Sequence, residues 1–216
     1  MGLFDRVRDA IGMGADAEAT EYDALLGMEA AGERMADLGY EPTGRAALCV
    51  AGVNTVRFRS AVEDAREALG EDRTADLAAH EDDQGFGWIV LREDALGEVT
   101  KAVHGAADAL AAGEYGDRLV VAVFEFVREG ERAYWLYAFG RGRFYPFAPR
   151  GGRERDREVE RGLQEALEGE IETEPAADHW YPFWPGRPGA APWVRESAEL
   201  DRKGPGAPGR RGRHRR

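Results

Sequence analysis

The sequence predicts an α+β fold in which helices pack on one face of an antiparallel or mixed β-sheet. Two observations support this class. Apolar residues recur at helical spacing in four segments, and short apolar runs bounded by turn residues lie between them. The resulting order is helix, strand, helix, strand pair, helix, strand pair, helix, which is typical of a sheet covered by helices on one side.

Four helices are predicted from apolar stripes that repeat every three or four residues. They cover about residues 21–38, 55–69, 94–113 and 153–168. Residues 55–59 also alternate like a strand, so the sequence does not fix the residue at which the second helix begins. The third is the clearest, because Asp94 can cap it and its stripe runs unbroken towards Gly113. The fourth is so highly charged that we expect it at the surface.

Six strands are predicted between and after these helices. Residues 45–50 form a nearly continuous apolar run, which is typical of a buried strand. Residues 74–80 and 86–91 form one hairpin, and residues 119–127 and 132–139 form another. Residues 143–147 extend the second hairpin after a Gly140-Arg141-Gly142 turn.

The chain of 216 residues has room for one ordinary domain with a tail at each end. We expect the domain over residues 20–170. Residues 1–19 form an amphipathic helix and a connector. Residues 171–216 hold Pro175, Pro182, Pro185, Pro188, Pro192, Pro205 and Pro208 among the ten prolines, and this composition is typical of an unstructured tail.

The net charge of −12 and the near absence of lysine indicate a salt-adapted, halophilic protein. An acidic bacterial protein with arginine-rich codon usage is the alternative. The single cysteine, Cys49, lies in an apolar run, where a buried thiol fits a reducing compartment. Charges near the N-terminus argue against a signal peptide, and no apolar stretch approaches the roughly 18 residues of a membrane span. We therefore expect a cytoplasmic protein. Peripheral contact with the inner face of the membrane is compatible with this location.

Catalytic and metal sites are not expected, and neither is a cofactor. The four histidines are widely separated, and the chain has no second cysteine that could complete a zinc site. The two serines, Ser60 and Ser197, do not lie in a Gly-x-Ser-x-Gly motif. The Gly140–Arg143 glycines join two strands rather than preceding a helix, so they do not form a phosphate loop.

A partner-binding surface is predicted where aromatic residues and arginines crowd together, since these types dominate interface hot spots. The segment Phe139–Pro149 is the first of two such clusters, and Trp180–Trp184 is the second. The predicted partner-binding residues are Arg141, Arg143, Phe144, Tyr145, Phe147, Trp180 and Tyr181. In the alternative, the aromatics fill the open end of the sheet and the second cluster straps the tail onto it.

The N-terminal segment carries Leu3, Phe4, Val7 and Ile11 on one helical stripe. This stripe can dock on its own domain, or it can lie on a membrane or a partner, and we name its four residues as predicted membrane-binding residues. The arginine-rich end of the chain could attract anionic partners, but it fits a solubilising extension. Nucleic acid is not an expected partner, because high salt weakens such binding.

Several segments resemble one known family: the opening Met-Gly-Leu-Phe-Asp-Arg, the entry to the first strand at Pro42–Ala47, the segment Arg141–Pro149, and Trp180-Tyr181-Pro182. Together they resemble the PspA-associated protein family PspAB over roughly residues 1–185. The resemblance implies a non-enzymatic accessory or adaptor role beside phage-shock protein A, PspA, in envelope stress. It also implies a PspA-like partner.

The predicted order of elements is similar to that of type III secretion chaperones and YbjN-like proteins. A chaperone-like module that binds peptides on its sheet is therefore the alternative function, and an unrecognised hydrolase is a third.

Overall fold

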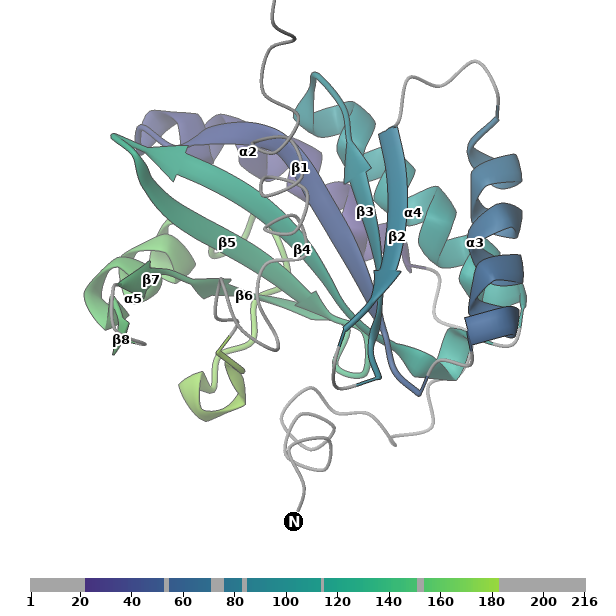
Figure 1. The fold of residues 1–216 in the computed structure, drawn as a ribbon. Coiled ribbons are helices and arrows are strands. Elements are labelled where there is room, and N and C mark those ends of the chain that lie inside the picture. The colour runs from purple at the N-terminus through teal and green to yellow at the C-terminus, as the bar shows by residue number, and fades with distance from the viewer. Residues whose placement is uncertain are drawn as a thin grey trace, which may run out of the picture.

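The computed structural model describes residues 22–52, 55–70, 76–82, 85–113, 115–150 and 154–182. Within these ranges an antiparallel six-stranded sheet is combined with helices, which confirms the α+β class (Figure 1). The large sheet contains β1 (Glu41–Val50), β2 (Asp76–Glu81), β3 (Gly87–Arg92), β4 (Leu119–Arg128), β5 (Glu131–Ala138) and β6 (Arg143–Phe147). The helices are η1 (Tyr22–Leu26), α2 (Gly27–Asp37), α3 (Thr55–Leu69), α4 (Leu96–Ala112), η2 (Gly116–Arg118), α5 (Arg157–Ala166) and η4 (Ala177–His179).

The strands of the large sheet lie in the order β2-β3-β1-β4-β5-β6, and each neighbouring pair is antiparallel. The two predicted hairpins are present as β2-β3 and β4-β5, and β6 extends the second hairpin as expected. Since β1 lies between them, it joins the hairpins into one sheet. The edges of the sheet are β2 and β6.

Strand β1 begins at Glu41, earlier than the apolar run alone predicts, because a bulge lets the strand continue past Pro42. The register with β4 shifts between Pro42 and Ala46. Gly44 lies in this interval with a φ of 71°, and a Cβ atom there would overlap the carbonyl oxygen of Glu93. Glycine is therefore required at this position.

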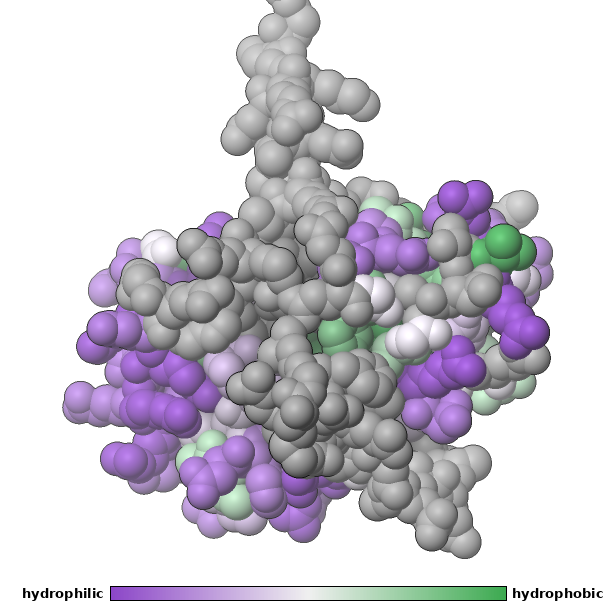
Figure 2. All heavy atoms as spheres, turned by 60° about the horizontal axis from the view of Figure 1, so that its bottom comes forward, coloured by the Kyte–Doolittle hydropathy of each residue, from purple (hydrophilic) through white to green (hydrophobic). Residues whose placement is uncertain are grey.

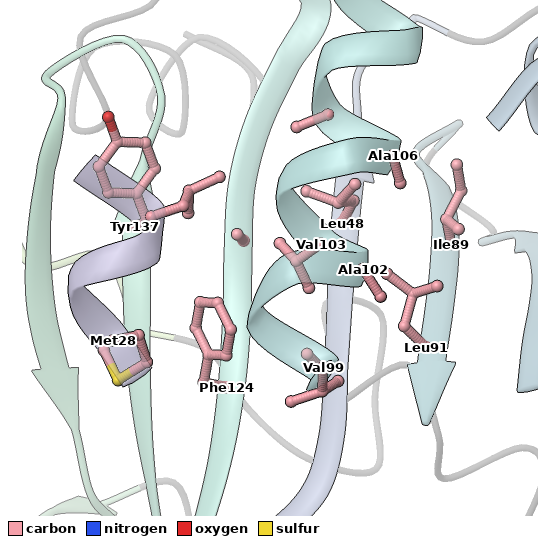
Figure 3. Close-up of a cluster of buried hydrophobic side chains, with 14 of the residues drawn as sticks. Met28, Leu48, Ile89, Leu91, Val99, Ala102, Val103, Ala106, Phe124 and Tyr137 are labelled. Carbon is pink, nitrogen blue, oxygen red and sulfur yellow. The ribbon is translucent and has the colours of Figure 1, made fainter. Parts of the chain in front are cut away.

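Helices α2, α3 and α4 lie on the same side of the large sheet (Figure 1). Figure 3 shows Val99, Val103 and Ala106 of α4 among side chains of the strands, including Leu48 and Phe124. The predicted stripe of α4 is buried, but its predicted cap is wrong: Ala95 occupies the N-cap position instead of Asp94, without a side-chain cap bond. The first predicted helix begins as the 3-10 helix η1 and becomes α-helical at Gly27.

The opposite face of the large sheet, here called the second face, is also apolar and buried. Alternate residues of the strands form a separate cluster there. Its strand members are Ala47, Cys49, Trp88, Val90, Val120, Val121, Val123, Tyr134, Leu136, Ala138, Tyr145 and Phe147. Because both faces are buried, the strands read as continuous apolar runs rather than as alternating patterns.

Helix α5 lies beside the β6 edge, preceded by the short strands β7 (Pro149–Arg150) and β8 (Glu154–Arg155). The sequence predicts it at the surface with an apolar side that includes Leu163, and the helix lies there with that side buried. The burial of Glu160 on the same side was not predicted. Asp156 caps α5 by accepting a hydrogen bond from Val159 N–H at 3.1 Å. This cap begins the helix later than the predicted residue 153.

Candidate partner-binding region

The predicted partner-binding residues come together at the β6 edge of the large sheet. Arg143–Phe147 forms β6, and Arg141 lies in the turn that joins it to β5. Trp180 and Tyr181 reach the same place from the segment that follows α5. We call Arg141–Phe147 together with Glu174–Tyr181 the β6 region.

The segment after α5 runs alongside β6 and takes up hydrogen bonds at its outer edge. Phe144 N–H donates to Glu172 O at 2.8 Å, and Glu174 N–H donates to Phe144 O at 2.7 Å. Arg143 also donates to Thr173 O at 3.4 Å. Part of the edge strand is thereby paired. Its N–H and C=O groups are then not available for pairing with a strand of another chain.

The aromatic side chains of β6 point into the molecule. Phe144 joins the helix-side core beside Tyr137, with ring centroids 4.9 Å apart. Tyr145 and Phe147 belong to the second face, and burial raises the pKa of the Tyr145 phenol. All three side chains are at most 1% exposed. Their placement agrees with the alternative in which the aromatics fill the end of the sheet.

Trp180 fastens the segment after α5 to the second face. Its side chain is buried there, and its indole N–H donates to Glu174 O at 2.9 Å. Its own carbonyl accepts a hydrogen bond from Arg155 at 2.7 Å. Tyr181 is half-buried and packs against the same cluster. The described chain therefore continues past the predicted domain end at residue 170. Residues 171–182, here called the strap, lie against the sheet.

Three of the predicted partner-binding residues keep part of their side chains at the surface: Arg141, Arg143 and Tyr181. Arg141 is held near the buried carboxylate of Glu174, with 3.9 Å between the ion-pairing atoms. His179 Nδ1 lies 3.1 Å from the same carboxylate, which also accepts from Ala176 N–H at 3.0 Å. Burial acts to raise the pKa of Glu174, but these hydrogen bonds and charges outweigh it and hold the pKa below its ordinary value.

A buried ion pair that the sequence analysis missed holds α5, β6 and the strap together. Arg155 Nε lies 2.7 Å from Glu160 Oε1, which also accepts from Ala148 N–H at 3.0 Å. The guanidinium group lies over the Phe147 ring at 4.9 Å. The sequence could have indicated the burial of Glu160, since this residue falls on the apolar side of α5, three residues before Leu163.

Glu125 is a second buried carboxylate that the sequence analysis missed. It lies on β4 and is 2% exposed. Tyr134 OH and Thr43 Oγ1 donate to it at 3.2 and 3.0 Å, and Arg132 lies 3.1 Å away. Its charge and the burial of the phenol raise the pKa of Tyr134, burial being the larger cause. Since Glu125 is fully partnered, we assign it a structural role.

The described surface carries a shallow groove between α3 and the edge strand β2. Phe58, Val62 and Ala79 supply its apolar floor, and charged residues line its sides, among them Arg59, Glu63 and Glu81. Figure 2 shows hydrophilic residues over much of the described surface in that view, with small separate apolar patches. The groove lies at the opposite edge from the β6 region.

Within the described ranges, no group of three or more His, Cys, Asp and Glu residues is placed to hold a metal ion. Cys49 is buried on the second face, and burial raises the pKa of its thiol well above the ordinary value, so it is a poor nucleophile. No helix of the described chain combines the length and apolarity that a membrane crossing requires. The predicted membrane-binding residues Leu3, Phe4, Val7 and Ile11 lie outside the described residues.

Comparison with known proteins supports one assignment. Neither curated proteins nor solved structures give a match, so the likeness to type III secretion chaperones stays an expectation. One family model does match, and its match begins at residue 1 and ends at residue 193. That model describes PspA associated protein B, PspAB, and the chain belongs to this family.

Proposed function

We propose that the chain is a non-enzymatic accessory or adaptor protein that binds PspA in the envelope stress response. The observation that carries this proposal is the PspAB family match over residues 1–193. The proposed contact is the β6 region. Its partly exposed residues, Arg141, Arg143 and Tyr181, are of the types enriched at interface hot spots.

The buried aromatics beneath these residues have a supporting role in this proposal. Phe144 and Tyr145 lie in the core, so they cannot touch a partner unless the edge of the sheet opens. They fix the backbone from which the arginines project, and Glu174 and the strap hold Arg141 and Arg143 from the other side. A surface that is ordered before binding loses less entropy when a partner arrives.

The test is recovery of PspA with the tagged full-length chain from the native organism. Arg141→Glu/Arg143→Glu should lower recovery at least about tenfold, since reversing two charges at an interface weakens binding by more than about 1.4 kcal/mol. Arg57→Glu/Arg59→Glu on α3 changes the net charge equally and leaves the β6 region intact. Equal recovery with both double variants would refute the proposed contact.

Alanine variants of Phe144 or Tyr145 cannot replace this test. Removing a buried aromatic side chain costs about 3–5 kcal/mol of stability, so lost recovery would report unfolding as much as binding. Thermal unfolding of each arginine variant should accompany the pull-down. A melting temperature within about 2 °C of the unchanged chain shows that the fold is retained.

The alternative function, a chaperone-like module, has one supporting observation in the groove between α3 and β2. Its apolar floor lies beside an edge strand, a combination that extended peptides use for strand addition. Binding of unfolded peptides that is lost in Ala79→Asp, a change at an exposed residue of the groove, and kept in Arg141→Glu/Arg143→Glu would favour this alternative.

A further inference from the structure

The second face of the large sheet is buried more completely than its described neighbours explain. Val90, Val123 and Leu136 are each at most 1% exposed. Among the described residues, no helix contributes a member to this cluster, whereas α2, α3 and α4 all pack on the other face. The strap supplies Trp180 and the half-buried Tyr181, and loops at the strand ends supply Ala51 and Phe86.

The strap residues alone are too small to cover this face. One tryptophan buries about 150–250 Å². The cluster extends from β3 to β6, which are four strand spacings apart, or about 19 Å at about 4.8 Å each. Trp180 lies at the β6 end of that distance, because its carbonyl accepts from Arg155, whose guanidinium group lies over Phe147. The part of the second face that extends from β5 towards β3 therefore needs a further cover.

The chain continues from this point with residues of suitable chemistry. Residues 183–194 read Phe-Trp-Pro-Gly-Arg-Pro-Gly-Ala-Ala-Pro-Trp-Val, with a single charged residue, Arg187. In the extended conformation that prolines favour, they can span about 37 Å at about 3.1 Å per residue, more than the face requires. Prolines also lack the N–H donor, which reduces the number of backbone groups left unpaired against a sheet face.

The extent of the family match is an independent observation. It ends at residue 193, so the aromatic part of this segment belongs to the family region, whereas the arginine-rich residues 202–216 do not. We propose that residues 183–194 continue the strap across the second face from β6 towards β3, with Phe183, Trp184 and Trp193 buried on it. This inference is independent of PspA binding.

The chain contains its own reporter for this cover. Cys49 is the single cysteine, and it lies on the second face in the central strand β1 at 3% exposed. The rate at which a maleimide reagent labels it in the native full-length chain measures how well the face is covered. Trp184→Asp/Trp193→Asp should raise that rate at least about tenfold, because charged residues do not stay against an apolar face. Leu200→Asp is the matched control and should leave the rate unchanged.

Three results would overturn the proposal. The first is an unchanged labelling rate in Trp184→Asp/Trp193→Asp. The second is a rise in Leu3→Asp/Phe4→Asp without a rise in the tryptophan variant, which would assign the cover to the N-terminal segment. The third is a rate that increases on dilution of the unchanged chain, which would assign the cover to a second copy.

A crosslinking measurement keeps the proposal testable if the aspartate variants do not fold. A photoreactive phenylalanine derivative at position 184 of the full-length chain should crosslink to peptides that contain β4 or β5. Crosslinks to α2 or α4, or between two chains, would contradict the proposed path.

Discussion

Removing the carboxylate of Glu160 should destabilise the protein more than its place in a charged helix suggests. The side chain is completely buried and pairs with Arg155, whose side chain is only 7% exposed. Glu160→Ala would leave that guanidinium group buried without its carboxylate. Breaking a buried pair in this way costs about 3–5 kcal/mol.

The same substitution removes the acceptor of the Ala148 N–H, an unpaired donor that costs about 1–3 kcal/mol. The two costs share one carboxylate and are not additive, so we expect a total loss of about 3–5 kcal/mol. Arg155→Met/Glu160→Leu removes both charges and should recover most of the loss, because apolar replacements of buried pairs are often neutral.

Equilibrium urea unfolding in molar salt measures these differences, and equal m values show that the variants unfold from comparable states. Since the pair is buried, added salt should change its contribution little. A loss below about 1 kcal/mol for Glu160→Ala would refute the reasoning, as would a double variant that is no more stable than the single one. Hydrogen exchange should also show faster exchange in the strap, because Arg155 binds Trp180 O.

Three further outcomes are expected. The hydrogen bond from Val159 N–H holds the pKa of Asp156 below its ordinary value of 3.8, so its stabilisation is present above that pH and is lost as the pH falls through the lowered pKa. Asp156→Ala should therefore cost about 1 kcal/mol in urea unfolding at pH 7 and less at pH 3; an equal cost at both would contradict this cap. Gly44→Ala should cost about 1–3 kcal/mol by the same assay, since the added Cβ overlaps Glu93 O, and a neutral effect would exclude the bulge. Leu3→Asp/Val7→Asp should abolish sedimentation with anionic liposomes at high salt if the N-terminal stripe binds membranes, and unchanged sedimentation would refute that prediction.

Much of the fold could be predicted from local patterns. The stripe of α4 and the apolar runs of β1, β4 and β5 are strong signals, because burial on one helix side or on both sheet faces leaves a periodic or continuous apolar sequence. The family could also be predicted, from short segments such as Arg141–Pro149, and the family match confirms it.

The contacts of the β6 region could not be predicted, because they join residues far apart in the chain. The prolines after residue 170 indicate a tail, yet Glu174 pairs with β6 and Trp180 enters the second face. Crowded aromatics predict either a surface or a core, and only the register of β6 shows that Phe144 and Tyr145 point inward to opposite faces. The burial of Glu125 could have been predicted, because it is the charged residue inside the apolar run Leu119–Val127.

Direct titration of purified PspA into the purified full-length chain, by calorimetry in molar salt, tests the proposed function most directly. The proposal predicts saturable binding that is at least about tenfold weaker in Arg141→Glu/Arg143→Glu and unchanged in Arg57→Glu/Arg59→Glu. The absence of binding to PspA, or equal affinity for the two charge-reversed variants, would contradict it.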